Sequence, residues 1–247
     1  MEEGKQQTKV FGIRAIIEAI NSGVSVDKIF LQKGVKGPLM QELNTLIKEK
    51  NISTSQVPIE KLDRLSKHMN HQGAVAQIAA VDFHDLDAIL NEEGKSNRLF
   101  LLLDGISDVR NFGAIIRTAE CTGVDAIVIA KAGSAPLNAE TIKTSAGAAF
   151  KIPICKVDHI KDAVFMMQAS EVQLVAATEK TDQLIYDVDF NGDTGIIMGS
   201  EHKGINPSIL KIVDQRAKLP MKGEISSLNV SVACGAFLYE ALRQRLS

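Results

Sequence analysis

The chain has 247 residues, 45% of them hydrophobic and 23% charged, which is the balance of a globular, core-forming protein with one large domain or two smaller ones. Aromatic residues make up only 4% and Trp is absent, so a wide aromatic platform for stacking bases is not the main binding mode. The net charge of -2 argues against a polyanion binder that ignores sequence, because such proteins are strongly basic.

The charge is distributed unevenly. Residues 1–80 carry 11 basic and 8 acidic residues, whereas residues 81–247 carry a net charge of -5. The mildly basic N-terminal part permits a nucleic-acid role. Cys121, Cys155 and Cys234 are scattered singly, which gives no zinc or redox motif. The sequence has no apolar signal core and no run of membrane-spanning length, so we expect a reduced, cytoplasmic protein without a metal site.

Residues 8–81 are predicted to form a small α/β unit. Apolar residues at helical spacing, from Phe11 to Ile20, predict a helix that Asn21-Ser-Gly23 ends. Further expected elements are a strand at 27–31, a helix around 39–47, a helix at 58–65 and a strand at 74–81. Residues 82–98 are rich in Asp, Glu, Asn and Gly around a short helical patch, 86–90, and are predicted to link two domains.

From Leu99 onwards, apolar strands alternate with helices. Leu99–Leu103 is apolar throughout, as buried parallel strands are, and the alternation predicts a parallel sheet covered on both faces. Expected strands are 99–103, 126–130, 152–157, 172–177, 194–198 and 216–219, and expected helices are 114–121, 139–149, 160–169 and 228–245. We therefore expect an α/β chain with a domain at 1–81, a linker at 82–98 and a domain at 99–247.

Neither common nucleotide fingerprint follows the first strand of this sheet. The chain continues Asp104-Gly105-Ile-Ser-Asp-Val-Arg-Asn-Phe-Gly113, without the glycine spacing of a Rossmann motif, and no P-loop is present. A nucleotide-dependent oxidoreductase is excluded on this ground. The following block, Asn111 to Glu120, has two interpretations. Asn111 could cap a helix and Arg117 could pair with Glu120 on its surface, or these side chains could face a ligand at the carboxyl end of a buried strand.

Two later segments leave the same choice open. Gly199-Ser-Glu-His-Lys-Gly204 follows a strand, and its glycines suit either a simple turn or a close approach to a ligand. Ser226-Ser-Leu-Asn-Val-Ser231 precedes the last helix, where Ser227 or Asn229 could be a cap, or the free N–H groups could bind an anion.

Taken together, the three segments resemble the three motifs of the SpoU (TrmH) family of RNA ribose 2′-O-methyltransferases in the SPOUT superfamily. The first motif is Asn111…Arg117-Thr-Ala-Glu120, the second Ile197-Met-Gly-Ser-Glu201…Gly204, and the third Leu219-Pro-Met221…Ser227-Leu-Asn-Val-Ser231. Residues 8–81 also resemble the family's L30e-like substrate-binding domain, and the two-domain arrangement is most like that of the RlmB-type 23S rRNA guanosine 2′-O-methyltransferases. One departure is Asp108-Val109-Arg110, where relatives usually have Asp-Pro-His.

The resemblance implies a trefoil-knotted parallel-sheet domain that binds S-adenosylmethionine, a homodimer whose active sites are completed by the partner subunit, and an rRNA substrate. Arg117 then orients a phosphate and stabilises developing oxyanion charge, since a guanidinium stays protonated. Implied catalytic residues are Arg117, Asn111, Glu120, Ser227 and Asn229; implied cofactor-binding residues are Gly199, Glu201, Gly204, Leu219, Met221, Leu228 and Thr178; candidate RNA contacts are Arg14, His71, Gln72 and Arg110.

Alternatives remain for the N-terminal residues and for the substrate. His71 and Gln72 could only fix a turn, and Lys33 and Lys36 could be a solvated face rather than specific readers. The same chemistry on tRNA or on another rRNA nucleotide is the first rival function, and the separate N-terminal domain favours rRNA over it. A non-catalytic RNA-binding paralogue is the second, and the intact Asn111, Arg117, Glu120 and Asn229 speak against it.

Overall fold

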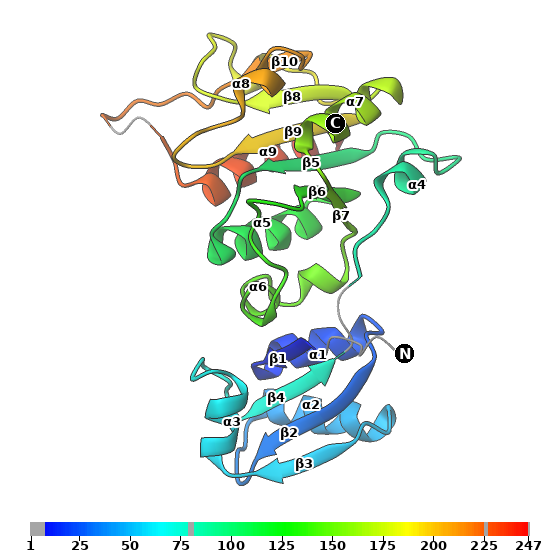
Figure 1. Cartoon of the computed structure of the whole chain (residues 1–247), viewed down its shortest axis with the longest axis vertical. Coiled ribbons are helices and arrows are strands. Elements are labelled where there is room, and N and C mark those ends of the chain that lie inside the picture. Colours follow the sequence, from blue (N-terminus) through cyan, green and yellow to red (C-terminus); the bar gives the residue numbers. More distant parts are fainter. Residues whose placement is uncertain (1–7, 79–81, 225–226, 247) are drawn as a thin grey trace. The chain divides into compact units, whose positions relative to one another are not determined.

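The computed structural model describes residues 8–78, 82–224 and 227–246 (Figure 1). By its contacts the chain divides into a first unit, Met1–Asp82 with Leu137–Lys151, and a second unit, Phe83–Pro136 with Ile152–Ser247. The end of the strand predicted at 74–81, and Ser226 of the third motif, lie outside the described residues.

The first unit contains a four-stranded mixed sheet in the order β1-β4-β2-β3. The central strand β4 runs antiparallel to both β1 and β2, whereas β3 runs parallel to β2. Apolar side chains from the strands and from α3 form a core on one face of the sheet. Its elements are β1 (Thr8–Phe11), α1 (Ile13–Asn21), β2 (Val26–Gln32), α2 (Pro38–Glu49), β3 (Thr54–Val57), α3 (Ile59–Leu65), β4 (Ala74–Ile78), α6 (Ala139–Thr144) and η1 (Ala148–Phe150).

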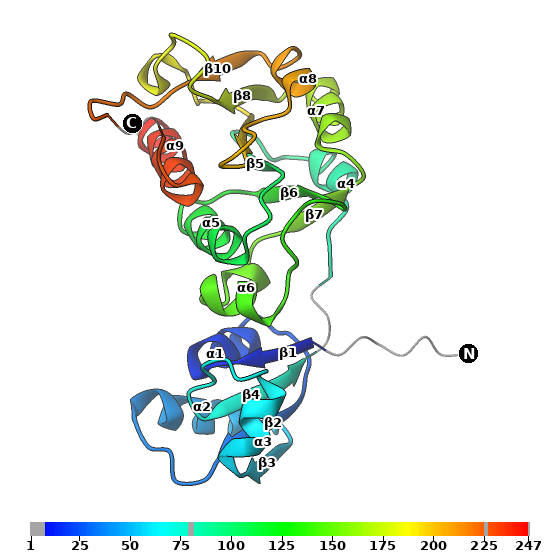
Figure 2. The same cartoon turned by 60° about the vertical axis from the view of Figure 1, so that its left-hand side comes forward.

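The second unit is a six-stranded, all-parallel sheet in the order β10-β8-β9-β5-β6-β7. Figure 2 shows α5 and α9 side by side on one face and α4, α7 and α8 on the other. Its elements are α4 (Leu86–Leu90), β5 (Leu99–Asp104), α5 (Val109–Cys121), β6 (Ala126–Ala130), β7 (Ile154–Val157), α7 (Ile160–Ala169), β8 (Gln173–Ala177), η2 (Ile185–Asp187), β9 (Thr194–Gly199), α8 (Pro207–Leu210), β10 (Gln215–Ala217) and α9 (Val230–Arg245).

The strand order of the second unit creates a switch point. β5, β6 and β7 follow one another towards one edge, and the chain then crosses to β8 and returns with β9 between β8 and β5. In parallel α/β sheets, ligands bind at the carboxyl ends of the strands where the order reverses, which here is the β5–β9 pair. The predicted parallel α/β sheet is confirmed, and the trefoil knot of this fold stays a prediction.

Several predicted elements differ from the observed ones. Phe11, expected on a helix, belongs to β1, where it pairs with Val75 of β4. β3 and α8 were not predicted, and α5 begins at Val109 rather than at Ala114. The helix expected over 139–149 ends at Thr144, and Gly147 has a φ of +86°, which breaks the helical path.

The predicted linker over 82–98 is mostly part of the second unit. Leu86 and Leu90 of α4 are buried in the core of that unit. Arg98 is 7% exposed; its guanidinium donates to the Asp193 carboxylate at 2.7 Å and to the Leu90 carbonyl at 2.8 Å. Although this segment is polar in composition, its apolar residues pack into the second unit. The first unit comprises Met1–Asp82 and also Leu137–Lys151, which the sequence placed within the predicted domain 99–247.

Candidate functional site

The loops after β5 and β9 leave the sheet at the same place. Asp104, the last residue of β5, is in register with Gly199, the last residue of β9. The Asp104 carboxylate also accepts a hydrogen bond of 2.7 Å from the backbone N–H of Asn206, which ties the two loops together. The first and second sequence motifs are thus neighbours because their strands are hydrogen-bonded partners.

The first motif begins on a helix whose cap is not the predicted residue. Asp108 is the N-cap of α5, and its carboxylate accepts from the backbone N–H groups of Arg110 and Asn111 at 2.9 and 2.8 Å. The interpretation of Asn111 as a cap is therefore wrong. Because Asp108 accepts the free N–H groups at the start of α5, the side chain of Asn111 can make other contacts.

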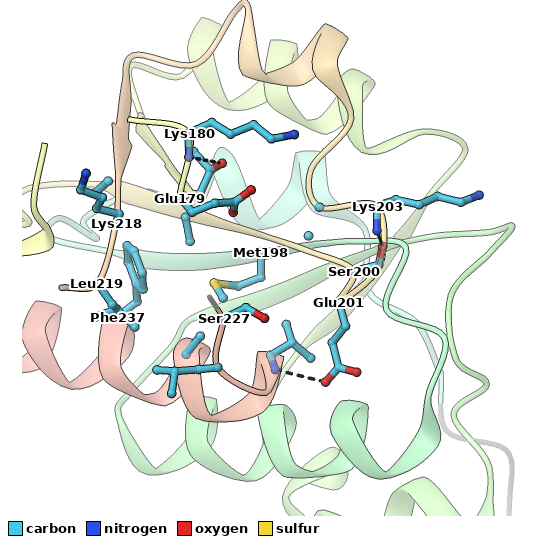
Figure 3. Close-up of a pocket in the computed structure, with 18 of the residues that line it drawn as sticks. Glu179, Lys180, Met198, Ser200, Glu201, Lys203, Lys218, Leu219, Ser227 and Phe237 are labelled. Atoms are coloured by element: carbon cyan, nitrogen blue, oxygen red, sulfur yellow. Dashed lines mark hydrogen bonds between the residues drawn. The ribbon is translucent and has the colours of Figure 1, made fainter. Parts of the chain in front are cut away.

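A polar cluster joins all three motifs. Asn111 Nδ2 donates to Glu201 Oε1 at 3.1 Å, and Asn229 Nδ2 donates to the same oxygen at 2.8 Å. Asn229 Nδ2 also lies 3.0 Å from Asn111 Oδ1. The backbone N–H of Val230 donates to Glu201 at 3.3 Å, and Figure 3 shows the Glu201 carboxylate directed at the first turn of α9. One carboxylate thus holds side chains that are 118 residues apart in the sequence.

Asn229 has a second task at the start of α9. Its side-chain oxygen accepts from the backbone N–H of Ser231 at 2.9 Å and of Val232 at 3.4 Å, so it is the N-cap of this helix. The cap interpretation of Asn229 is therefore confirmed, and the N–H groups expected to bind an anion already have acceptors in Glu201 and Asn229. The amide oxygen caps the helix while the amide nitrogen faces Glu201.

Beside this cluster lies a pocket of about 360 Å³, within the usual range for small-molecule sites. It is formed by the loops after β8, β9 and β10 together with the start of α9 (Figure 3). All seven residues predicted to bind the cofactor line it, as does Ser227. These are Thr178, Gly199, Glu201, Gly204, Leu219, Met221 and Leu228.

The pocket combines an apolar interior with a charged rim. Met198, Leu219 and Phe237 supply much of the apolar wall, and Phe237 is buried. Charged lining side chains are Glu179, Lys180, Glu201, Lys203 and Lys218. Such a site suits a ligand with a flat apolar part and a charged part.

Gly199 allows the floor of the pocket to form. A Cβ atom at this position would lie 2.2 Å from the carbonyl carbon of Gly204 and 2.3 Å from the backbone nitrogen of Ile205. Gly204 itself has a φ of +67°, and its N–H donates to the Ser200 carbonyl at 2.9 Å. The chain therefore reverses direction tightly over residues 199–204, and only glycine fits at position 199.

Arg117 and Glu120 stand apart from the pocket. Arg117 is exposed on α5 and does not line the pocket, and among the described residues it makes no hydrogen bond or ion pair. Glu120 is half-buried and contacts the Cys121 thiol at 3.8 Å. The interpretation of Arg117 and Glu120 as a surface ion pair is therefore wrong. Asn111 and Arg117 leave α5 in different directions, since six residues turn a helix by about 600°.

The candidate RNA contacts of the first unit have different environments. Arg14 is exposed on the first turn of α1. His71 is 7% exposed; its Nδ1 accepts from the Gly73 N–H at 2.9 Å, and its Nε2 lies 3.2 Å from the Asp63 carboxylate. Gln72 accepts from the Ile13 N–H at 3.2 Å and so caps α1 from a distance. His71 and Gln72 therefore fix a turn, and their contact with RNA stays a prediction.

Sequence reasoning missed several residues that build the site. Asp104 is the last residue of β5 and Asp108 lies in the loop after it, and their position at a strand end was the signal that could have identified them. Met198 lies within the second motif without being assigned to the cofactor, and Phe237 belongs to an apolar run that carries no functional signal. Arg110, the departure from the usual motif, is exposed on the first turn of α5.

Other kinds of centre find no support in the described residues. Burial raises the pKa of the Cys234 thiol to about 12 and that of Cys155 to about 11, so neither is a thiolate nucleophile near neutral pH. No group of three potential ligands could hold a metal ion within residues 8–78, 82–224 and 227–246. In the same ranges, every helix is too short or too polar to cross a membrane.

The chain matches known proteins along almost its whole length. The family models of the SpoU rRNA Methylase family and of the RNA 2′-O ribose methyltransferase substrate binding domain match residues 98–239 and 9–84. A 23S rRNA (guanosine-2′-O-)-methyltransferase RlmB from Xanthomonas axonopodis pv. citri is 35% identical, with 98% of each chain covered.

Two further proteins extend the match. A putative TrmH family tRNA/rRNA methyltransferase from Staphylococcus aureus is 34% identical, with 97% of each chain covered. The SpoU methyltransferase AviRb from Streptomyces viridochromogenes, solved with AdoMet, is 25% identical with a TM-score of 0.82; the match covers 97% of this chain and 91% of that one. Together with the converging motifs, these matches show that the chain belongs to the SpoU rRNA methylase family.

Proposed function

We propose that this protein transfers a methyl group from S-adenosylmethionine to the 2′-hydroxyl of a guanosine ribose in large-subunit (23S) rRNA. The proposal depends on one observation: Asn111 and Asn229 both donate to the same carboxylate oxygen of Glu201. This contact lies at the edge of a pocket that is formed by loops at the strand ends. The named activity of the Xanthomonas relative supports the choice of substrate.

The pocket fits the cofactor in size and chemistry. Its apolar wall of Met198, Leu219 and Phe237 suits an adenine, and the carboxylates of Glu179 and Glu201 suit a ligand with positive charge. The tight loop at Gly199 lets backbone groups approach the ligand closely. When bound there, S-adenosylmethionine supplies a methyl group that its positively charged sulfur already activates.

The protein's remaining task is to hold and deprotonate the ribose hydroxyl. The amide side chains of Asn111 and Asn229, fixed by Glu201, are placed to orient a ribose at the pocket edge. Ser227 lines the same pocket. A guanidinium is a poor base, so we assign Arg117 to orienting an RNA phosphate, through which the hydroxyl proton leaves, and to stabilising charge that develops on the 2′-oxygen.

We further propose that a second copy of the chain completes the site. Arg117 does not line the pocket of its own chain and has no partner among the described residues, although its role requires it to reach substrate. α9, which packs beside α5 (Figure 2), exposes Val232 and Tyr239 by 57% and 56%. Exposed apolar side chains on the helix that packs against the helix of Arg117 are what a symmetric dimer would cover.

The first unit is proposed to bind the RNA substrate outside the target nucleotide. Arg14 is exposed there, and Arg110 is exposed at the entrance of α5 in the second unit. Because the proposed substrate is rRNA, we place the reaction in the cytoplasm. A tRNA substrate remains the second candidate, since the name of the Staphylococcus relative includes tRNA.

The test is to map 2′-O-methylation across total RNA from a strain that lacks this protein. One guanosine of 23S rRNA should lose its methyl group and regain it on expression of the wild-type chain, but not of Arg117→Ala. Loss of a tRNA methyl group instead would favour the second candidate. An unchanged methylation map would overturn the assignment of the activity.

A further inference from the structure

One face of the sheet in the first unit carries both apolar and basic side chains. Side chains alternate along a strand, so Lys9 shares a face with Phe11, and Lys28 shares it with Phe30. Phe11, Phe30 and Val75 form the core beneath α3. Figure 1 shows α3 at the end of the sheet where β2 ends and β4 begins, so the start of β2 and the end of β4 lie beyond it.

The strand register aligns the polar positions of this face in a row. Lys9 of β1 is paired with Gln77 of β4, and Gln77 is paired on its other side with Lys28 of β2. A bulge between Val26 and Lys28 produces this pairing. Two strand spacings separate the backbones of the two lysines, which is about 10 Å.

A third lysine joins the row from α3. The ammonium group of Lys61 lies 5.6 Å from the centre of the Phe30 ring, and that of Lys28 lies 5.7 Å from the same centre. Contact with the ring face holds both side chains in place. Two positive charges at one ring repel each other, and an anion bound between them would relieve that repulsion.

No carboxylate neutralises this row among the described residues. Lys9, Lys28 and Lys61 make no ion pair there, and no acidic side chain shares their face of the strands. The nearest acidic positions are Asp27, which falls at the bulge, and two residues of α3, Glu60 beside Lys61 and Asp63, which contacts His71. The face is therefore basic within a unit whose sequence is also net basic.

We propose that Lys9, Lys28 and Lys61 bind the phosphate backbone of the RNA substrate. This inference rests on the proposed function and names the surface that the substrate-binding unit uses. Lysines contact phosphates as point charges, so the surface recognises backbone rather than base sequence. The match of residues 9–84 to a substrate-binding family supports RNA as the occupant.

The test compares two double variants of the full-length chain with equal charge change. Lys9→Gln/Lys28→Gln removes two of the three lysines. Lys48→Gln/Lys50→Gln is the matched control at the end of α2, which packs against α1. Affinity for a 23S rRNA transcript is measured by fluorescence anisotropy from about 50 to about 400 mM KCl. Losing two phosphate contacts should weaken binding on the order of tenfold at low salt and reduce the log–log salt slope by about 1.4 to 1.8.

The control variant should keep the wild-type affinity and slope, and Lys9→Arg/Lys28→Arg should restore both. S-adenosylmethionine binding and thermal unfolding report whether the variants remain folded. If Lys9→Gln/Lys28→Gln keeps the wild-type dependence of RNA affinity on salt, the inference is overturned. This holds even if the wild-type enzyme methylates rRNA. Equal losses in both glutamine variants would also overturn it, because the effect would then be net charge alone. If the wild-type enzyme fails to methylate rRNA, the proposed function fails instead.

Discussion

The two units use opposite ways of presenting functional groups. In the second unit, side chains from three strand-end segments converge on Glu201 beside a small pocket. In the first unit, the lysines proposed to bind RNA are spread across a sheet face. Converging groups can hold one ribose and one methyl donor in a fixed geometry, whereas spread charges can hold a long polyanion in many registers. Chemistry and substrate capture should therefore respond differently to substitution.

The largest effect is expected at Arg117. Arg117→Ala should lower kcat by about 10²- to 10³-fold or more, because a charged group that stabilises the transition state is lost. S-adenosylmethionine binding should persist, since Arg117 does not line the pocket. Single-turnover methyl transfer with saturating rRNA measures kcat, and isothermal titration measures the cofactor. A kcat near the wild-type value would remove Arg117 from the catalytic machinery.

Mixing variants decides which subunit's site Arg117 serves. Gly199→Ala should abolish cofactor binding, since its Cβ would overlap the Gly204 backbone. If Arg117 acts on the partner's site, refolding equal amounts of Arg117→Ala and Gly199→Ala together should recover about a quarter of the wild-type activity, through mixed dimers. If the mixture stays inactive, Arg117 acts within its own chain.

Asn229→Ala should have two separable effects. Loss of its amide nitrogen frees Glu201 and Asn111, which we expect to lower kcat/KM by about 10²-fold through misplaced substrate. Loss of its amide oxygen removes the cap of α9 and should lower the free energy of unfolding by about 1 kcal/mol. Asn229→Ser is the control, because its hydroxyl oxygen can cap the helix without the amide nitrogen and without adding a charge beside Glu201. Recovery of stability without activity is the expected result, measured by urea unfolding and methyl transfer.

The boundary between the units is tested by Leu90→Ala. Because Leu90 is buried in the core of the second unit, the substitution should lower the free energy of unfolding by about 2 to 5 kcal/mol. Ile89→Ala, at a partly buried neighbour, should cost less. Urea unfolding provides the measurement. If the free energy of unfolding changes by only a few tenths of a kcal/mol, residues 82–98 act as a linker, as the sequence predicts.

The smallest effect is expected at a single lysine of the first unit. Lys61→Gln should weaken RNA binding by about threefold at low salt and leave kcat unchanged at saturating RNA. Anisotropy titrations and methyl-transfer assays separate the two quantities. A lower kcat at saturating RNA would mean that the first unit also shapes the catalytic geometry, and the contrast between the units would be weaker than we describe.

Most of the second unit was predictable because its strands are continuous apolar runs, such as Leu99–Leu103 within β5. Elements that depend on distant partners were not. Phe11 fits a helical period, yet pairing with Val75 of β4 makes it a strand residue. Thr54–Val57 has no apolar run, and it becomes a strand because β2 offers it hydrogen bonds.

In the candidate site, too, some features were predictable from the sequence, and those that depend on distant partners were not. The residues that the family resemblance implies for the cofactor line one pocket, because strand ends of a parallel sheet meet at one edge, and their binding of the cofactor stays a prediction. The role of Glu201 could not be derived, since it depends on the side-chain directions of Asn111 and Asn229. The cap interpretation of Asn111 arises because Asn and Asp both cap helices and the predicted helix begins five residues after the observed one, whose cap is Asp108.

The polar cluster around Glu201 has a consequence for the protein during its synthesis. Asn111 follows the first strand of the second unit, whereas Asn229 precedes its last helix, and both must reach the same carboxylate. A growing chain therefore has no complete polar cluster until residue 229 has left the ribosome and α9 has docked. We expect a nascent chain to be unable to methylate the very ribosome that is making it.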